Sequence, residues 1–356
     1  MNKHLTAFLI AFILCLSLCS CAKEEPKPTI TDTVSLWCVE GFPAADALGT
    51  LVDEFNAIPY NNVRVELRHF VSEDALALSF NSMRPDLMLC YSDRAWTIMG
   101  MSDCISVPMM SELILSPGFE MFSESVFLPI GGELSLLLSR KGTGVSGLTL
   151  PKLCARAKNS GKEFIAVSCC ADLFAASMDE LESEFHFDIG ADKTDSNFAY
   201  LFNMLAELAF SGSLRLCAKP AEAVANGELS CAVVRSEELT GLELSDCEIS
   251  SMPDMTLEKS QFIASVIGLA VTAEEGRGAE GINAFLSWLV LEKRLGSAAL
   301  RCGLLPATAF EPAEDPLSQA IEALAGECRL YSHSGVYSSL RDGFDRQMLE
   351  ALKLVY

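Results

Sequence analysis

The chain has 356 residues, of which 48 are acidic and 26 are basic, giving a formal net charge of -22. This acidic excess argues against nucleic acid as a partner, because phosphate binding needs clustered lysine and arginine side chains. It also disfavours docking on anionic lipid surfaces. The length exceeds what one hydrophobic core of about 150 residues needs, so two lobes are expected.

The N-terminal segment has the pattern of an export signal. After a basic flank, residues 5–18 form an apolar run that is shorter than the roughly 20 residues of a membrane-spanning helix. The pattern Leu18-Cys19-Ser20-Cys21 at its end resembles the bacterial lipobox, whose last cysteine becomes the mature N-terminus and carries acyl chains such as palmitate. We therefore expect a lipoprotein signal peptide over 1–20, lipidation at Cys21, and a flexible tether over 21–33. An ordinary cleaved signal peptide and an N-terminal membrane helix are the alternatives.

Cysteine is unusually frequent for an exported protein. Most of the cysteines lie inside apolar runs such as LMLCYS and LSCAVV, where a thiol behaves as a small buried hydrophobe. No Cys-x-x-Cys pair or Cys/His spacing suits zinc, so no metal or cofactor is expected. Vicinal Cys169-Cys170 could close a strained ring, but reduced core thiols are the favoured interpretation. The eleven cysteines after Cys21 are Cys38, Cys90, Cys104, Cys154, Cys169, Cys170, Cys217, Cys231, Cys247, Cys302 and Cys328.

The elements after the tether alternate between strand and helix. A continuous apolar run at 34–40 predicts a buried strand, and helical spacing of apolar residues follows at 43–58. Strict alternation at 63–68 predicts a half-exposed strand, 72–83 a helix, and 86–92 another buried strand. The order strand, helix, strand, helix, strand implies a parallel sheet with helices on both faces.

The pattern is repeated in the middle of the chain, where a second α/β lobe is expected. Long apolar strands at both ends of this region are predicted to cross between the lobes, and helices follow towards the C-terminus. The predicted strands are 134–141, 162–170 and 262–272; the predicted helices are 196–210, 279–300 and 334–354; and 220–234 is predicted as a helix that ends at Asn226-Gly227 before a strand.

In this order the elements resemble the solute-binding proteins of ABC importers, in particular the carbohydrate-binding group. The similarity is carried by islands in the correct order, including VSLWCVEGFPAADALGTLVDEFNA, PDLMLCYSDRAW, LPIGGELSLLLSRKG and the segment that ends in GLLPA. It implies an α/β fold of the periplasmic-binding-protein type II, with two α/β lobes joined by crossover strands at a hinge. The implied lobes are 34–133 plus 262–310 and 134–261 plus 311–356.

The resemblance also implies a ligand site at the carboxyl ends of the strands. Carboxylates there would accept hydrogen bonds from hydroxyl or ammonium groups, arginines would donate, and aromatic rings would pack on the apolar side of a sugar. Asp93-Arg94 could equally be a surface ion pair, whereas an acid inside an apolar crossover strand, Glu133, is costly unless it faces the cleft or a partner. The candidate ligand residues are Glu40, Phe42, Asp93, Arg94, Trp96, Glu133, Arg235 and Tyr337.

Departures from the family pattern leave the ligand open. The second-lobe loops VSCCADL and VVRSEEL lack the aromatic residues on which sugars usually stack, and Glu237-Glu238 within them is expected to be solvated charge. The implied function is a lipid-anchored, extracytoplasmic component that captures a small solute, with a sugar favoured, and delivers it to permease subunits. The alternatives are a two-lobed surface protein without transport, or import of a polyamine, peptide or other solute. No hydrolase or nucleotide-binding motif indicates an enzyme.

Overall fold

The computed structural model describes most of the chain after the tether. The described residues are 30–59, 61–99, 104, 105, 107–122, 126–160, 164–168, 196–253, 262–274, 278–312, 315–324, 328–331, 346 and 348–350. The expectations for the signal peptide, Cys21, Cys169-Cys170 and Tyr337 lie outside these residues, as does most of the predicted helix 334–354. No helix among the described residues is long and apolar enough to cross a membrane.

The first lobe begins with the predicted strand and helix alternation. β1, β2 and β3 are parallel, in the order β2-β1-β3, and β9 pairs antiparallel with β3. Period-2 alternation along β1 sends Val34, Leu36 and Cys38 to one core and Trp37 to the other. The elements are β1 (Asp32–Val39), α2 (Ala45–Asn56), β2 (Val63–Phe70), α3 (Glu73–Phe80), β3 (Leu87–Tyr91), α4 (Ser92–Met99), the 3₁₀ turns η1 (Pro108–Glu112) and η2 (Phe119–Phe122), and β9 (Phe262–Val271).

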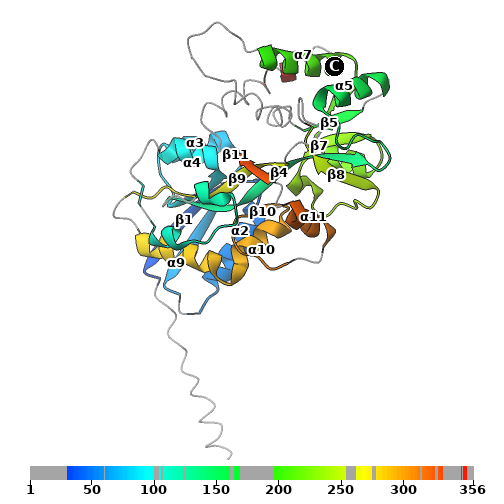
Figure 1. The fold of residues 1–356 in the computed structure, drawn as a ribbon. Helices are drawn as coiled ribbons and strands as arrows, with labels where there is room; N and C mark the ends of the chain where they lie inside the picture. The colour runs from blue at the N-terminus through cyan, green and yellow to red at the C-terminus, as the bar shows by residue number, and fades with distance from the viewer. Residues whose placement is uncertain are drawn as a thin grey trace, which may run out of the picture.

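The second lobe is built around β7, with β5 and β6 parallel to it. Its helices α5 and α7 lie together at one end of the molecule, and Figure 1 shows them on the far side of β5 and β7 from β1. Its elements are α5 (Leu150–Ser160), β5 (Ile165–Val167), α7 (Ser196–Phe210), β6 (Leu214–Leu216), α8 (Pro220–Ala225), β7 (Cys231–Arg235), the 3₁₀ turn η3 (Ser236–Leu239) and β8 (Cys247–Ser251).

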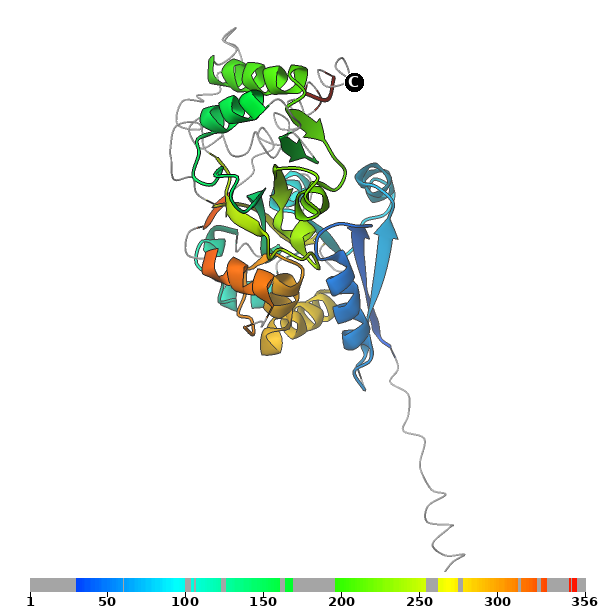
Figure 2. The same cartoon turned by 90° about the vertical axis from the view of Figure 1, so that its right-hand side faces the viewer.

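Strand β4 (Phe127–Arg140) runs through both lobes and changes partners on the way. On one edge it pairs with β9 as far as Ser135 and with β8 from Leu136. On the other edge it pairs with β10 (Leu305–Pro306) at residues 131 and 132 and with β7 from Ser135. The change of partners therefore falls at residues 133–135, and a single curled sheet joins the lobes (Figure 2).

This strand starts earlier than the predicted 134–141. Its first half contains Pro129 and the pair Gly131-Gly132, which weaken the sequence signal for a strand. The structure accommodates them with a register shift between Pro129 and Gly131, and it needs the glycines for close packing. A Cβ atom on Gly131 would lie 2.7 Å from the carbonyl oxygen of Leu305.

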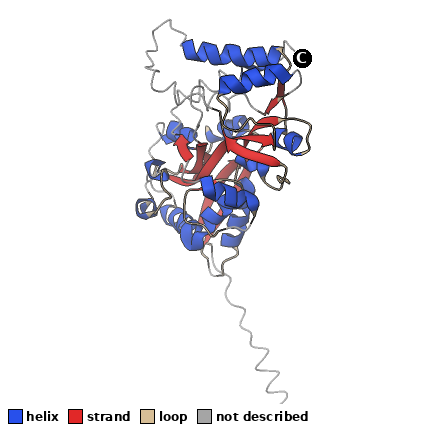
Figure 3. Ribbon diagram, turned by 45° about the vertical axis from the view of Figure 1, so that its right-hand side comes forward, coloured by secondary structure: helices blue, strands red, loops and turns tan. Residues whose placement is uncertain are grey.

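The C-terminal helices cover the first lobe, and Figure 3 shows helices on the outside of the strands in both lobes. The predicted helix 279–300 is broken, because Glu292 and Lys293 adopt left-handed backbone angles, with φ of 53° and 60°. This separates α9 from α10, and α10 then packs on α2 and α9. The remaining elements are α9 (Ala279–Val290), the 3₁₀ turn η4 (Leu291–Lys293), α10 (Arg294–Arg301), β10 (Leu305–Pro306), α11 (Pro316–Leu324) and β11 (Cys328–Tyr331).

The described thiols support the sequence interpretation, since no disulfide joins any two of the nine described cysteines. Burial raises the pKa of Cys154 and of Cys231 to about 12, and that of Cys38 to about 11. These thiols therefore stay protonated at neutral pH and serve as small core residues.

Candidate functional site

A row of polar side chains crosses the sheet where β4 changes partners. Tyr91 on β3 pairs with Ile267 on β9, Glu133 pairs with Ser265 two residues away, and Ser135 pairs with Arg235 on β7. Paired residues, and residues two apart on one strand, share a face of the sheet. The register thus places Tyr91, Glu133 and Arg235 on one face, contributed by strands of both lobes.

The row is also where the buried sheet opens to solvent. Of the described β9 residues 264–271, Ser265 alone is not buried. Along β4, every residue is buried except Ser135 and the terminal Arg140. Polar and partly exposed positions thus interrupt strands that are otherwise apolar, at the point where the two lobes join.

Glu133 is the centre of the contacts in this row. The Tyr91 hydroxyl donates a hydrogen bond to Oε2 of Glu133 at 2.9 Å, and Nη1 of Arg235 lies 3.7 Å from Oε1. The same Nη1 is 3.5 Å from the Tyr91 hydroxyl. The Glu133 side chain is only 5% exposed, so its charge depends on these partners rather than on water.

Glu237 brings a second carboxyl group to the same point. Its pKa is raised to about 8, first by burial and then by the negative charge of Glu133, with Arg235 acting in the opposite direction. The Glu237 side chain is half-buried and lines the cavity described below. Glu237 is therefore not the freely solvated charge that the sequence suggested.

Tyr91 also joins the site to the loop after β1. Burial and the neighbouring Glu133 raise the pKa of Tyr91 well above its usual range, so it remains a donor. The ring of Phe42 lies edge-on to that of Tyr91, with centroids 4.9 Å apart and planes at 65°. Such an arrangement fixes both rings and offers an apolar surface beside the polar row.

The 3₁₀ turn η3 is held at the junction by three contacts. Ser236 accepts a hydrogen bond from the Leu134 amide at 3.1 Å, and Glu238 accepts one from the Arg235 amide at 3.2 Å. Gly303, after α10, has φ of +77°, and a Cβ atom there would lie 2.7 Å from the Ser236 carbonyl oxygen. The turn that carries Glu237 is therefore packed against a segment of the first lobe.

A cavity of about 440 Å³ opens beside this cluster. Its walls come from the residues after β5, β6 and β7, the three parallel strands of the second lobe, and from α8. Carboxyl ends of parallel strands are where open α/β sheets bind ligands. The lining residues are Ser168, Ala218, Lys219, Ala221, Glu222, Arg235, Glu237 and Glu238.

Known structures share this architecture over nearly the whole chain. The ABC substrate-binding protein of Listeria monocytogenes in complex with cycloalternan has a TM-score of 0.69 at 12% identity, covering 91% of this chain and 94% of that one. The GacH receptor of Streptomyces glaucescens, solved unliganded and with acarbose, has a TM-score of 0.69 at 14% identity, covering 91% and 94%. The cyclic α-maltosyl-1,6-maltose binding protein of Arthrobacter globiformis has a TM-score of 0.61 at 14% identity, covering 92% and 95%.

The chain has the fold of the type II periplasmic binding proteins. The two α/β lobes and their crossover strands agree with the expectation from sequence, and the strand order in the first lobe is β2-β1-β3-β9-β4. No protein-family model and no curated protein matches the sequence. The likeness to these solved binding proteins is therefore one of fold.

Within this binding-protein fold, three of the predicted ligand residues come together. Glu133 and Arg235 form the ion pair, and Phe42 contacts them through the Tyr91 ring. Two residues of the cluster, Tyr91 and Glu237, were not among the predicted ligand residues. The available signal for Tyr91 was its place as the last residue of a buried strand. For Glu237 it was a carboxylate two residues beyond the end of β7.

The other predicted residues are placed differently. Asp93 and Arg94 lie in the first turn of α4, and Asp93 is 3% exposed. Arg94 forms an exposed ion pair with Glu73 at 3.0 Å, a different partner from the Asp93 of the surface-pair alternative. Glu40 is exposed in the turn after β1. Trp96 lies in α4, although its side chain is outside the described set, and Tyr337 lies outside the described residues altogether.

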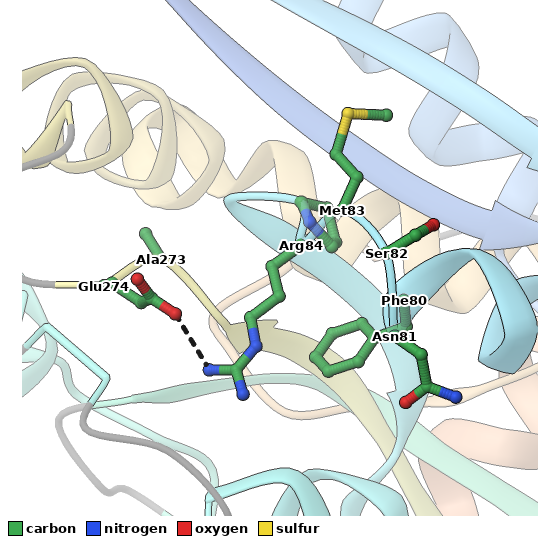
Figure 4. A pocket seen from close by; sticks show the side chains of 8 residues that line it. Phe80, Asn81, Ser82, Met83, Arg84, Ala273 and Glu274 are labelled. Carbon is green, nitrogen blue, oxygen red and sulfur yellow. Dashed lines mark ion pairs between the residues drawn. The ribbon is translucent and has the colours of Figure 1, made fainter.

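A second cavity, of about 310 Å³, lies at the opposite end of β3 from Tyr91. In it Arg84 pairs with Glu274 at 3.3 Å, and its guanidinium carbon is 5.6 Å from the centre of the Phe80 ring (Figure 4). The charge of Arg84 already has a carboxylate partner, and this end of the sheet carries the amino terminus of β3. We therefore place the candidate site at the Tyr91 end.

Proposed function

We propose that the chain is the lipid-anchored substrate-binding component of an ABC importer, which captures a sugar between its lobes and delivers it to permease subunits. The observation that carries this proposal is the Tyr91, Glu133, Arg235 and Glu237 cluster, which combines groups from both lobes beside an open cavity. The solved proteins of the same fold include ones bound to cycloalternan and to acarbose. These likenesses favour a carbohydrate.

The chemistry of the cluster suits a solute that carries hydroxyl groups. Glu133 and Glu237 accept hydrogen bonds, while Arg235 and the Tyr91 hydroxyl donate them, so neighbouring hydroxyls of a sugar can each find a partner. Phe42 would cover an apolar edge of the ring. Glu40, Asp93, Arg94, Trp96 and Tyr337 remain proposed ligand residues.

Capture requires that the solute bind the closed arrangement better than the open one. A solute that touches groups of both lobes gains some of its contacts only when the lobes close over it, and this difference shifts the equilibrium. We propose the lobe boundaries 34–133 plus 262–310 and 134–261 plus 311–356. Met348, which is packed in the second-lobe core, supports the assignment of the C-terminal end.

Calorimetric titration of the purified protein tests the proposed cargo. The panel comprises maltotriose, a cyclic α-glucan and common monosaccharides, with spermidine and a tripeptide as non-sugar solutes. Binding of a sugar by the wild type and by Glu54→Gln, whose side chain is exposed on α2, together with its loss in Glu133→Ala, is the expected result. If none of the sugars gives a heat of binding, sugar capture is contradicted. A heat of binding with spermidine or the peptide alone would instead support a different cargo.

The anchor is tested separately by metabolic labelling. Cells that express the chain are grown with labelled palmitate, and Cys21→Ala is compared with Cys19→Ala, a neighbour in the same pattern. Lipid anchoring predicts that the label is lost only in Cys21→Ala. Equal labelling of both variants, or no label in the wild type, would exclude Cys21 as the anchor. Because binding and anchoring are measured independently, either can fail without the other.

A further inference from the structure

The outer edge of β2 has no neighbouring strand among the residues that the structure describes. The strand is the last one on its side of the sheet, with β1 as its partner, and Figure 2 shows it on the outside of the molecule. An edge strand presents unpaired amide and carbonyl groups, to which a strand of another chain can be added. What covers these groups therefore decides whether another chain can bind at this edge.

The pairing with β1 determines which residues of β2 point outward. The Glu40 amide donates to the Phe70 carbonyl oxygen at 2.8 Å, so Phe70 points towards the first strand. In a parallel pair, the backbone groups of successive residues point to opposite sides of the strand, so the even-numbered residues of β2 face β1. The odd-numbered residues direct their amide and carbonyl groups to the open edge; they are Val63, Val65, Leu67 and His69.

The Asn56 side chain occupies this edge at Val65. Asn56 is the exposed last residue of α2. Its Nδ2 donates to the Val65 carbonyl oxygen and its Oδ1 accepts from the Val65 amide, both at 2.8 Å. An antiparallel neighbouring strand would exchange the same two hydrogen bonds at this position. One turn further on, Asn61 accepts from the Val63 amide at 3.0 Å, so side chains of the same chain take the place of a strand over the first half of the edge.

The second half of the edge is open. No hydrogen bond among the described residues uses the outward backbone groups of Leu67 or His69. A strand that approached this edge would therefore find two available positions next to one that Asn56 already holds.

The charges along β2 make the edge complementary to itself. Arg64, Glu66 and Arg68 are exposed on one face of the strand and alternate in sign. When two copies of the strand run antiparallel about a two-fold axis at Leu67, Glu66 of each copy lies opposite Arg68 of the other. Opposite charges at facing positions stabilise a strand pair, whereas an axis at Glu66 or at Arg68 would place like charges together.

This self-pairing needs the position that Asn56 holds. Centred on Leu67, two copies exchange hydrogen bonds at Leu67 itself and, on either side of the axis, between Val65 and His69. With Asn56 in place only the central pair remains, which gives little to offset the repulsion between two chains that each carry a net charge of -22. An axis at Val65 would need the Val63 amide as well, which another side chain already holds.

We propose that the edge of β2 fits a second copy of this chain and that Asn56 blocks it, so that loss of the Asn56 amide lets two copies join antiparallel through residues 65–69. The partner is a second copy because β2, when reversed, itself supplies the sequence of charges that the edge matches. The inference concerns the first lobe alone and does not depend on the proposed cargo.

Sedimentation equilibrium of the purified protein in physiological salt tests the blocking role. The wild type should sediment as a monomer, and Asn56→Ala as a dimer at the same concentration. The control Asp315→Ala also loses a hydrogen bond between a side chain and the backbone, because Asp315 accepts from the Ser318 amide at 2.9 Å on α11, and it should stay monomeric. If Asn56→Ala associates no more than the wild type does, the proposal is refuted.

Charge substitutions separate strand pairing from unspecific aggregation. In the Asn56→Ala background, Glu66→Arg places like charges opposite each other and should restore the monomer. Adding Arg68→Glu makes the facing charges opposite again and should return the dimer. Association that Glu66→Arg leaves unchanged would be of another kind and would contradict pairing through β2.

A measurement on the wild type covers the case in which Asn56→Ala does not fold. Amide hydrogen exchange, followed by NMR, should be at least about tenfold slower at Val65, whose amide donates to Asn56, than at Leu67, whose amide points to the same edge without a partner among the described residues. Equal exchange at the two amides would show that Asn56 does not cover the edge.

Discussion

Replacing Tyr91 with phenylalanine removes a single oxygen atom from the floor of the cleft. That hydroxyl donates to Oε2 of Glu133 at 2.9 Å, and the carboxylate is 5% exposed. A hydrogen bond to a charged group contributes about 1.5–3 kcal/mol, and water has little access to replace it. We expect Tyr91→Phe to lower the free energy of unfolding by about this amount.

The corresponding change in melting temperature is small but measurable. An unfolding entropy of about 2.1 cal/mol/K for each residue, applied to a chain of this size, gives roughly 1.5 °C for each kcal/mol. Circular dichroism at pH 7 should therefore record a decrease of about 2–4 °C.

The control is Thr50→Val, which removes a hydroxyl on the exposed face of α2 that donates to the Asp46 carbonyl oxygen. It should change the melting temperature by well under about 1 °C, because surface substitutions usually stay within about 0.5 kcal/mol. If Tyr91→Phe has the same melting temperature as the wild type, or one no lower than that of Thr50→Val, the hydrogen bond from the Tyr91 hydroxyl to Glu133 does not stabilise the fold. The description of this cluster would then be wrong.

Two further outcomes follow from the packing. Gly131→Ala would place a Cβ atom 2.7 Å from the Leu305 carbonyl oxygen, so chemical denaturation should show that the free energy of unfolding falls by about 1–3 kcal/mol. The control Gly49→Ala, whose added Cβ atom would have its nearest neighbour at 3.5 Å, should show no such decrease. Equal effects of the two substitutions would contradict the close packing at the β4 bulge. Iodoacetamide at pH 8, read by peptide mapping, should modify the partly exposed Cys217 and spare Cys231, whose pKa is raised to about 12 by burial; modification of both at one rate in the folded protein would contradict that burial.

Local periodicity was sufficient for the first lobe of the fold. The alternation in 63–68 and the helical spacing in 43–58 reflect which side of each element meets a core, and β2 and α2 form where expected. The same reasoning failed at Glu292 and Lys293. Their left-handed backbone angles break the apolar stripe that suggested one helix, and no glycine or proline marks the position.

The site was harder to predict, because its residues meet through pairing between distant strands. Glu133 was recognisable as a carboxylate within an apolar strand, which needs a partner or a cleft. Its partners depend on registers that no local pattern contains: β3 beside β9 brings Tyr91, and β7 beside β4 brings Arg235. The burial of Glu237 depends on how η3 packs against β4, and no local sequence pattern shows this packing. The two adjacent acids, Glu237 and Glu238, were therefore interpreted as surface charge.

The continuity of β4 also affects how one lobe can rotate relative to the other. The N-terminal part of β4, up to Ser135, is hydrogen-bonded to β9 and β10. The C-terminal part, from Ser135 onwards, is hydrogen-bonded to β7 and β8. Rotation of one lobe against the other must then twist this hydrogen-bonded strand, because the lobes are not joined at this point by a flexible linker. Amide hydrogens of β4 near Glu133 consequently report lobe rotation directly, and stiffening or loosening those few peptide units would tune the energy of the movement without touching any group that meets the cargo.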